Sequence, residues 1–181
     1  MHYICALTII NQCDFITNYL AVLDSNIYAG SQGSGVYLST NYGTSWTEVN
    51  NGLTSKYIRS IAVSGTNIYA GTSISSTFTG GIFLSTNNGS SWTAVNNGIG
   101  PNIYSIVVSG SYIITATYAG IYRSSNNGAS WTSASSGLAV LTTRFLTVSG
   151  NSIYAGNSFG VYLSVNNAGP VSYTHLTLPT I

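Results

Sequence analysis

Short apolar runs separated by Gly, Asn and Ser recur along the whole chain. In residues 58–95 the run IRSIAVS is followed by a turn at 65–67 and then by IYAGT, GIFLST and, after a tight turn at 87–89, SWTAV. These runs are rich in Ile, Val, Tyr and Trp, as strands are, and Gly/Asn/Ser punctuation between them is typical of turns. No segment has a 3.6-residue apolar period. The pattern predicts an all-β chain built from groups of four short strands.

The four-strand group is repeated. Similar segments begin at Asn18, Arg59, Tyr104 and Arg144, and the same serine recurs at positions 39, 85, 124 and 164, at spacings of 46, 39 and 40 residues. A period near 40 residues is expected for one blade of a β-propeller. Runs such as 61–63 and 106–108 are apolar on both faces, which suits a sheet packed between two neighbouring sheets.

The repeats predict a β-propeller fragment of about three and a half four-stranded antiparallel blades that form an open ring. We expect a non-repeat segment at 1–15, blades at 16–54, 55–99 and 100–139, a partial blade at 140–170, and a separate tail at 171–181. An open ring leaves an unpaired edge and exposed apolar faces, so we expect the chain to be poorly soluble or to associate through those edges.

One nine-residue motif marks each of the first three repeats, as STNYGTSWT, STNNGSSWT and SSNNGASWT. Asn can bond backbone N–H groups two residues on in an Asx-turn, and Gly supplies the left-handed conformation of a tight hairpin. The hydroxyl of the second serine of the motif (Ser45, Ser91 or Ser130) can satisfy a second backbone group, and Trp offers an apolar wedge with an available indole N–H. The motif therefore predicts three structural turns, formed by Ser39, Asn41, Gly43, Ser45, Trp46, Ser85, Asn87, Gly89, Ser91, Trp92, Ser124, Asn126, Gly128, Ser130 and Trp131.

This motif resembles the Asp-box, or BNR repeat, whose pattern is Ser/Thr-x-Asp-x-Gly-x-Ser/Thr-Trp. The resemblance covers residues 16–169, and Asn41, Asn87 and Asn126 stand where the family has Asp. It implies a propeller in which these turns are stabilising and lie away from the active centre. Proteins with such repeats include sialidases, sortilin-like receptors, glucan-cleaving glycosidases, photosystem II assembly factor-like propellers and extracellular bacterial repeat proteins, and the last group is the most similar.

The end of the chain departs from the repeat. Residues 171–180 read VSYTHLTLPT, which resembles the translated form of a sequencing adapter found at the ends of metagenomic reads. We expect this tail to be an artefact outside the fold, so that His175 has no functional meaning and further blades belong to the natural protein.

Charge narrows the function classes. The chain has four Lys/Arg and three Asp/Glu in 181 residues, so it offers neither the basic footprint of a nucleic-acid binder nor a polybasic membrane patch. No apolar run approaches the length of a membrane span, and no Cys/His pattern has metal-ligand spacing. We expect no cofactor and no metal, and a secreted or cell-surface protein. Cys5 and Cys13 are either a disulfide or two free thiols.

Catalysis is not expected of this chain. Its acids are Asp14, Asp24 and Glu48, and none of them forms the carboxylate pair that glycoside hydrolysis needs. Asp24 occupies the position of a turn glycine in the other repeats, and Glu48 is predicted to face solvent. Arginines are present, but the arginine-bearing motif of sialidases is absent.

Binding is the remaining class of function. In a four-stranded meander the turns between strands 1 and 2 and between strands 3 and 4 lie at one end of the blade. Arg59, Tyr104 and Arg144 begin strand 1 and should therefore emerge at the opposite end, beside the 2–3 loops. The longest of these loops, 72–81, carries Phe78. We predict a ligand rim of Arg59, Tyr104, Arg144 and Phe78 that contacts a glycan or a protein; the alternative is that the arginines only solubilise strand ends.

Three further aromatic residues lie near the same loops. Tyr57, Tyr118 and Phe159 either stack on sugars or fill gaps between blades.

The leading hypothesis is a non-catalytic propeller module that serves as a scaffold or binding surface. The alternatives are a fragment of a sialidase-like glycoside hydrolase whose catalytic residues lie in other blades, and an assembly-factor-like propeller that binds a protein.

Overall fold

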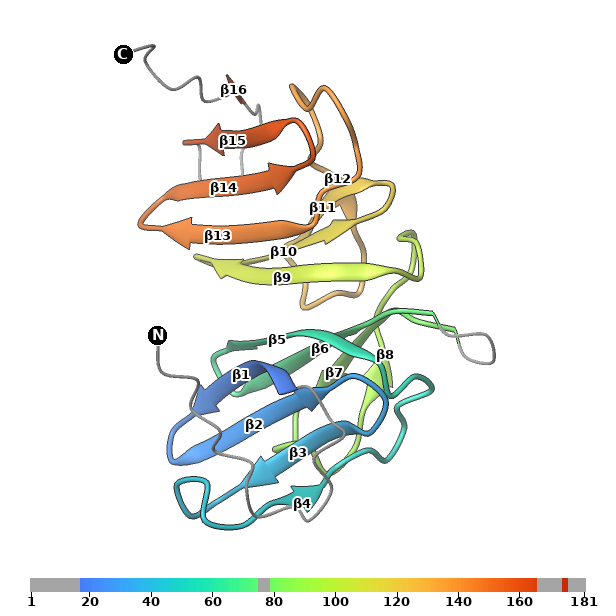
Figure 1. The fold of residues 1–181 in the computed structure, drawn as a ribbon, viewed down its shortest axis with the longest axis vertical. Helices are drawn as coiled ribbons and strands as arrows, with labels where there is room; N and C mark the ends of the chain where they lie inside the picture. Colours follow the sequence, from blue (N-terminus) through green and yellow to red (C-terminus); the bar gives the residue numbers. More distant parts are fainter. Residues whose placement is uncertain (1–16, 75–78, 166–173, 176–181) are drawn as a thin grey trace.

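The computed structural model describes residues 17–74, 79–165 and 174–175, and within these ranges all regular structure is β. Sixteen strands form four antiparallel sheets, each made of four consecutive strands. The all-β prediction and the open arrangement of four-stranded sheets are confirmed (Figure 1). The strands of the first two sheets are β1 (Thr17–Leu23), β2 (Asn26–Ser31), β3 (Gly35–Ser39), β4 (Thr47–Glu48), β5 (Ile58–Ser64), β6 (Asn67–Thr72), β7 (Ile82–Ser85) and β8 (Thr93–Ala94). Those of the last two are β9 (Ile103–Ser109), β10 (Tyr112–Thr117), β11 (Gly120–Ser124), β12 (Thr132–Ser133), β13 (Phe145–Ser149), β14 (Ser152–Asn157), β15 (Gly160–Ser164) and β16 (Thr174–His175).

Each sheet is a simple up-and-down meander because tight turns join its strands. The turn between strands 1 and 2 needs a left-handed residue, and Gly65, Gly110 and Gly150 adopt φ values of 58°, 57° and 56° there. Asp24 takes the same conformation, with φ of 55°, in the first sheet. Asp is one of the few non-glycine residues that tolerate this region, so the prediction that Asp24 is a turn residue is confirmed.

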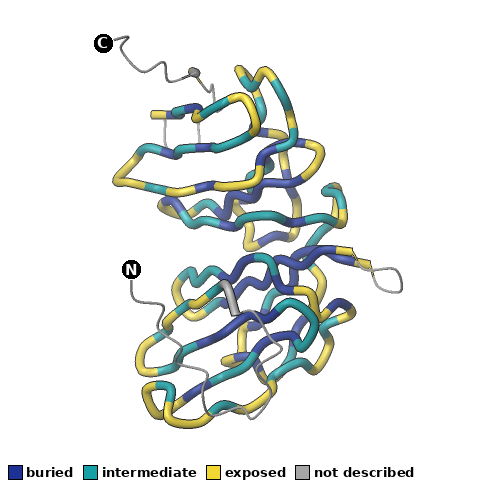
Figure 2. Tube along the Cα trace, viewed as in Figure 1, coloured by how far each residue is buried: buried dark blue, intermediate teal, exposed yellow. Residues whose placement is uncertain are grey.

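The sheets pack face to face through their first strands. Neighbouring strands β1, β5, β9 and β13 lie side by side along the molecule (Figure 1). Three apolar cores fill the spaces between consecutive sheets, and each takes side chains from both sheets. Burying one such Ile or Leu stabilises the fold by about 1.5–3 kcal/mol. Figure 2 shows the result, with buried residues along the strands and exposed residues mainly at the turns.

The fourth sheet takes its last strand from beyond residue 170. Its fourth strand is β16, which pairs with β15 through Tyr162↔His175 and Leu163↔Thr174. Two residues of the tail that was expected to lie outside the fold therefore belong to a sheet. The physical reason is that the edge of β15 presents unpaired backbone N–H and C=O groups, which an extended segment of almost any sequence can satisfy.

Candidate functional site

The four sheets give the molecule two ends. Turns between strands 1 and 2 and between strands 3 and 4 lie at one end, called here the motif end. Turns between strands 2 and 3 and the connections between sheets lie at the other, called here the loop end (Figure 1). The division follows from the antiparallel meander, and each candidate residue can be assigned to one of these two ends.

The motif end carries three nearly identical turns. In the second, Ser85 Oγ accepts a hydrogen bond from Gly89 N at 2.8 Å, and Asn87 Oδ1 accepts one from Ser91 N at 2.9 Å and one from Ser85 Oγ at 3.0 Å. Asn87 Nδ2 donates to Ser91 Oγ at 2.8 Å. The turns of Ser39–Ser45 and Ser124–Ser130 repeat all four bonds within 0.2 Å.

Two details of these turns differ from the sequence prediction. The Asn side chain bonds the backbone N–H four residues on, because two consecutive left-handed residues, such as Asn88 and Gly89, curl the chain back over it. The second backbone N–H is satisfied by the first serine of the motif, whereas the last serine accepts from the Asn amide. The polar side chains of the turn thus satisfy one another, as a structural turn requires.

The motif tryptophans connect consecutive sheets. Trp92 Nε1 donates to the carbonyl of Val49 at 2.7 Å, and Trp131 Nε1 donates to that of Val95 at 2.7 Å. Each carbonyl belongs to the sheet before the tryptophan. The Nε1 of Trp46, in the first sheet, is buried and has no hydrogen-bond partner among the described residues. The indole N–H predicted to be available is therefore used between sheets in two of three motifs.

The loop end holds the predicted rim. Arg59 Nε donates to Ser73 Oγ at 3.3 Å, so this guanidinium lies against the start of the 2–3 loop, as expected. The guanidinium of Arg144 lies over the ring of Tyr104, 5.5 Å from its centroid, across the third and fourth sheets. Phe78 lies outside the described residues. The structure thus brings Arg144 and Tyr104 together and places Arg59 at the same end.

Lys56 also lies at the loop end. Its carbonyl accepts hydrogen bonds from Gly33 N and Gly35 N, both at 3.0 Å, in the 2–3 turn of the first sheet. Its ammonium is 3.8 Å from Glu48 Oε2. Three of the chain's four basic side chains are therefore at this end; the fourth, Arg123, lies over Tyr112 at 5.4 Å near the motif end.

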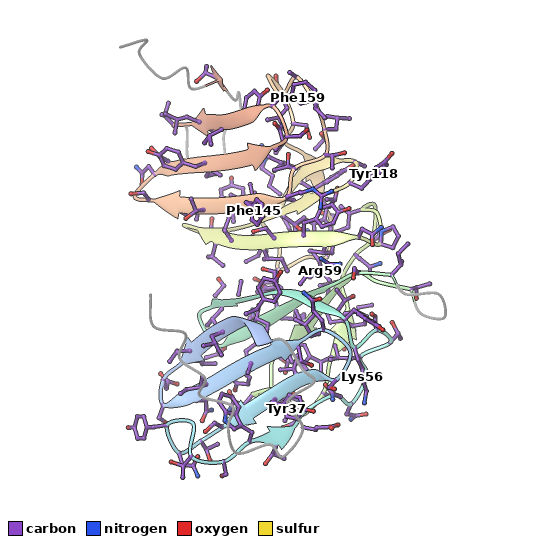
Figure 3. All side chains as sticks on the ribbon, viewed as in Figure 1. Tyr37, Lys56, Arg59, Tyr118, Phe145 and Phe159 are labelled. Atoms are coloured by element: carbon purple, nitrogen blue, oxygen red, sulfur yellow. The ribbon has the colours of Figure 1, made fainter. Side chains whose placement is uncertain are left out.

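Exposed aromatic side chains accompany these cations. Tyr118 and Phe159 lie in the 2–3 turns of the third and fourth sheets, and Tyr57 precedes β5. All three are exposed, Tyr118 and Phe159 more than Tyr57. Figure 3 shows Lys56, Arg59, Tyr118 and Phe159 on the side of the molecule where the loop end lies.

Among the described residues the carboxylates are Asp24 and Glu48, and they do not form a pair. Asp24 is in a turn at the motif end. Glu48 is exposed on β4, as predicted, where it accepts hydrogen bonds from Tyr37 Oη at 3.3 Å and Asn50 Nδ2 at 3.2 Å. Asp14, Cys5 and Cys13 lie outside the described part of the chain.

The titrating groups with shifted pKa values are tyrosines away from the rim. Burial raises the pKa of Tyr28, Tyr37 and Tyr69 above the ordinary 10.0. No cluster of three or more His, Cys, Asp or Glu that could hold a metal is found among the described residues. In the same part of the chain there is also no helix that could span a membrane.

One set of contacts was missed by sequence reasoning. Ser60 Oγ accepts from Ile106 N at 2.9 Å, and Ser105 Oγ accepts from Leu146 N at 3.2 Å, so a serine in strand 1 of one sheet bonds strand 1 of the next. The signal was present, because Ser60 and Ser105 occupy the same position in their repeats.

The sequence matches no protein-family model and no curated protein, whereas the fold matches many solved structures. An ancestral GH74 enzyme is 25% identical, with a TM-score of 0.68 over 89% of this chain and 24% of that one. YCF48 bound to D1 peptide is 17% identical, with a TM-score of 0.69 over 88% of this chain and 54% of that one. The extracellular domain of the hybrid two component system BT4673 from B. thetaiotaomicron is 16% identical, with a TM-score of 0.69 over 91% and 23%.

These similarities and the four radially packed meanders show that the chain folds as a segment of a β-propeller. It spans about a quarter of the GH74 and BT4673 chains and about half of YCF48.

Proposed function

We propose that this propeller segment is a non-catalytic binding module of a secreted or cell-surface protein, and that its ligand contacts the loop end. One observation carries the proposal: Lys56, Arg59 and Arg144 gather at that end with exposed aromatic side chains, while the motif end is occupied by turns that satisfy their own polar groups. Binding residues commonly lie on loops that a rigid scaffold holds in place.

The preferred ligand is an acidic, extended protein segment. Three cations against one neighbouring carboxylate, Glu48, give the loop end a positive potential that attracts anionic groups. The guanidinium of Arg144 lies over the Tyr104 ring, so the two side chains together offer an apolar surface and N–H donors that suit a carboxylate. That a similar fold, YCF48, has been solved with a bound peptide supports this class of ligand.

A second candidate is a glycan. Exposed Tyr118 and Phe159 present ring faces in adjacent 2–3 turns, a surface on which sugars can stack. The similarity to a GH74 enzyme adds weight to a carbohydrate ligand. Hydrolysis is not part of the proposal, because glycosidases place two carboxylates about 5–10 Å apart across the bond they cleave. Asp24 lies in the β1–β2 turn at the motif end, whereas Glu48 lies on β4 beside Lys56 of the loop end.

Parallel selections test this function. The chain is immobilised and used to pan a random-peptide phage library, and in parallel it is probed on a glycan array. We expect enrichment of Asp- and Glu-containing peptides whose binding falls on doubling the salt concentration and on changing Arg59 and Arg144 to Ala. Binding of neutral glycans that depends on Tyr118 and Phe159 would instead support the second candidate. Ligands whose binding is unaffected by changes at Arg59, Arg144, Tyr118 and Phe159 would contradict the whole proposal.

A further inference from the structure

The first and last sheets each have one face that no other described sheet covers. Leu20 is 62% exposed, whereas Ile61, Ile106 and Leu146 at the same position of the later repeats are 9%, 4% and 8% exposed. At the other end of the row of sheets, Val161 is 45% exposed, whereas its equivalents Val36, Ile82 and Ile121 are completely buried. The two open faces are thus the two halves of the interface that the chain forms between its own sheets.

Inside the chain these halves interlock at a glycine. The Cα of Gly30 in β2 lies so close to Ile58 and Ile61 of the next sheet that an added Cβ would be 2.5 Å from Ile58 Cγ2 and 3.0 Å from Ile61 Cδ1. Gly71 in β6 accepts Ile103 and Ile106 of the third sheet in the same way, at 2.5 Å and 3.0 Å. The first two interfaces therefore seat isoleucines of one strand 1 against the strand-2 glycine of the preceding sheet, whereas the third has Ala116 and Leu146 in its core.

The last sheet presents this seat uncovered. Gly156 in β14 is equivalent to Gly30 and Gly71, and the atom nearest to an added Cβ there is 3.7 Å away, in Phe145 of the same sheet. A hollow of about 260 Å³ lies over it, lined by Phe145, Leu146, Thr147, Tyr154, Gly156 and Val161. Its lining is almost wholly apolar, and Phe145 is labelled on this sheet in Figure 3.

The first sheet presents the complementary surface. Leu20 and Val22 of β1 are exposed on one face, and Tyr37 of β3 lies on the same face, since it pairs with Ala29, which pairs with Leu20. Of the three equivalents of Tyr37, Phe83 and Tyr162 are buried in the cores between sheets and Tyr122 is partly buried. Trp46 is a second observation that the first sheet lacks a preceding neighbour. Its buried Nε1 has no partner among the described residues, whereas Trp92 and Trp131 each donate to the preceding sheet.

We propose that the open face of the first sheet docks onto the open face of the last sheet of a second copy of this chain, so that Leu20 enters the hollow over Gly156. Continuity with the internal interfaces argues for this occupant, because the second copy offers the same strand, with apolar Leu20 at the position of Ile61 and Ile106, which pack against Gly30 and Gly71. An aromatic residue at the position of Phe145 is no obstacle, since Tyr19 occupies that position in the interface between the first two sheets. Two copies joined head to tail at both faces make a ring of eight sheets, within the range of four to eight that closes a propeller.

Sedimentation velocity of the 181-residue chain tests the association. We expect a species of twice the 19.0 kDa chain mass. Leu20→Asp and Val161→Asp each block one half of the interface and should each give monomers with an unchanged far-UV circular dichroism spectrum. Tyr118→Asp, an equally exposed residue at the loop end, is the matched control and should remain dimeric.

Complementation distinguishes head-to-tail docking from other modes. Immobilised L20D retains an intact last sheet and V161D retains an intact first sheet, so L20D should capture V161D but not a second L20D. A wild-type chain that stays monomeric overturns the proposal and leaves these faces to sheets of a different polypeptide region or another protein. Dimers that V161D abolishes and L20D does not would overturn it as well, because they would show last sheet packed on last sheet. Either result leaves the ligand role of the loop end untouched.

Discussion

The indole Nε1 of Trp92 donates a 2.7 Å hydrogen bond to the carbonyl of Val49, which belongs to the preceding sheet. Trp131 and Val95 form the same bond one sheet further on. In the second and third sheets the motif that closes the β-hairpin therefore also fixes the hairpin to the preceding sheet. This double role explains why one short turn is so regular in the chain.

Replacing Trp92 by Phe should lower the free energy of unfolding by about 1–3 kcal/mol more than replacing Trp46 by Phe. Both changes remove the same ring volume, but only W92F leaves a buried carbonyl without its donor. Urea unfolding followed by far-UV circular dichroism, in the L20D background so that association does not contribute, measures the difference. Equal losses in the two variants would show that the indole bond is of no consequence.

Gly71 and Gly156 should respond in opposite ways to substitution by Ala. In the same background, G71A should destabilise the chain by about 1–3 kcal/mol, because its new methyl group overlaps Ile103. G156A has free space and should be neutral or stabilising by up to about 1 kcal/mol, through reduced entropy of the unfolded chain. The midpoint of urea unfolding reports both, and a stabilised G71A would contradict the interlocking described for the sheets.

Asn87 should tolerate Asp better than Ala. N87A removes the oxygen that accepts from Ser91 N and Ser85 Oγ, and should cost about 1–2 kcal/mol of stability. N87D keeps that oxygen, and its second oxygen can accept from Ser91 Oγ in place of the amide donation. Thermal unfolding of the two variants checks the order, and a more stable N87A would mean that backbone conformation alone holds the turn.

Stability should fall at high pH. Burial raises the pKa of Tyr28 and Tyr69 in the folded chain above 10.0, so the folded state keeps protons that the unfolded state releases. Their contribution is complete below pH 10 and is lost as the pH rises through the folded-state pKa. Absorbance at 295 nm should show a delayed phase of phenolate formation that coincides with unfolding. Normal titration of both tyrosines in the folded chain would contradict this account.

Sequence patterns predicted the sheets well because each repeat carries its own strand and turn signals. Asp24 could be placed in a left-handed turn because three glycines hold its position in the other repeats. Contacts between repeats were harder to predict, since a polar residue such as Ser60 gives no sign of whether it faces solvent or the backbone of the next sheet. The pairing of β16 was missed for a related reason, because an open sheet edge selects extended backbone and not side chains.

For the residues of the proposed ligand rim, the sequence indicated a shared end of the sheets but not the contacts between the side chains. Alignment of the repeats put Arg59, Tyr104 and Arg144 at the same end, but the contact between Arg144 and Tyr104 depends on how consecutive sheets pack. The exposure of Tyr118 and Phe159 could not be predicted from the sequence either, since it depends on how the turns pack.

Affinity for an acidic peptide, selected by panning and labelled with a fluorophore, tests the proposed function most directly. Arg144→Ala is compared with Arg123→Ala, because both arginines lie over a tyrosine ring, at 5.5 Å and 5.4 Å, but near opposite ends of the sheets. Fluorescence anisotropy should show about a tenfold weaker Kd for R144A, corresponding to about 1.4 kcal/mol, and an unchanged Kd for R123A. Equal affinity of R144A and the wild type, or a loss confined to R123A, would contradict a ligand face at the loop end.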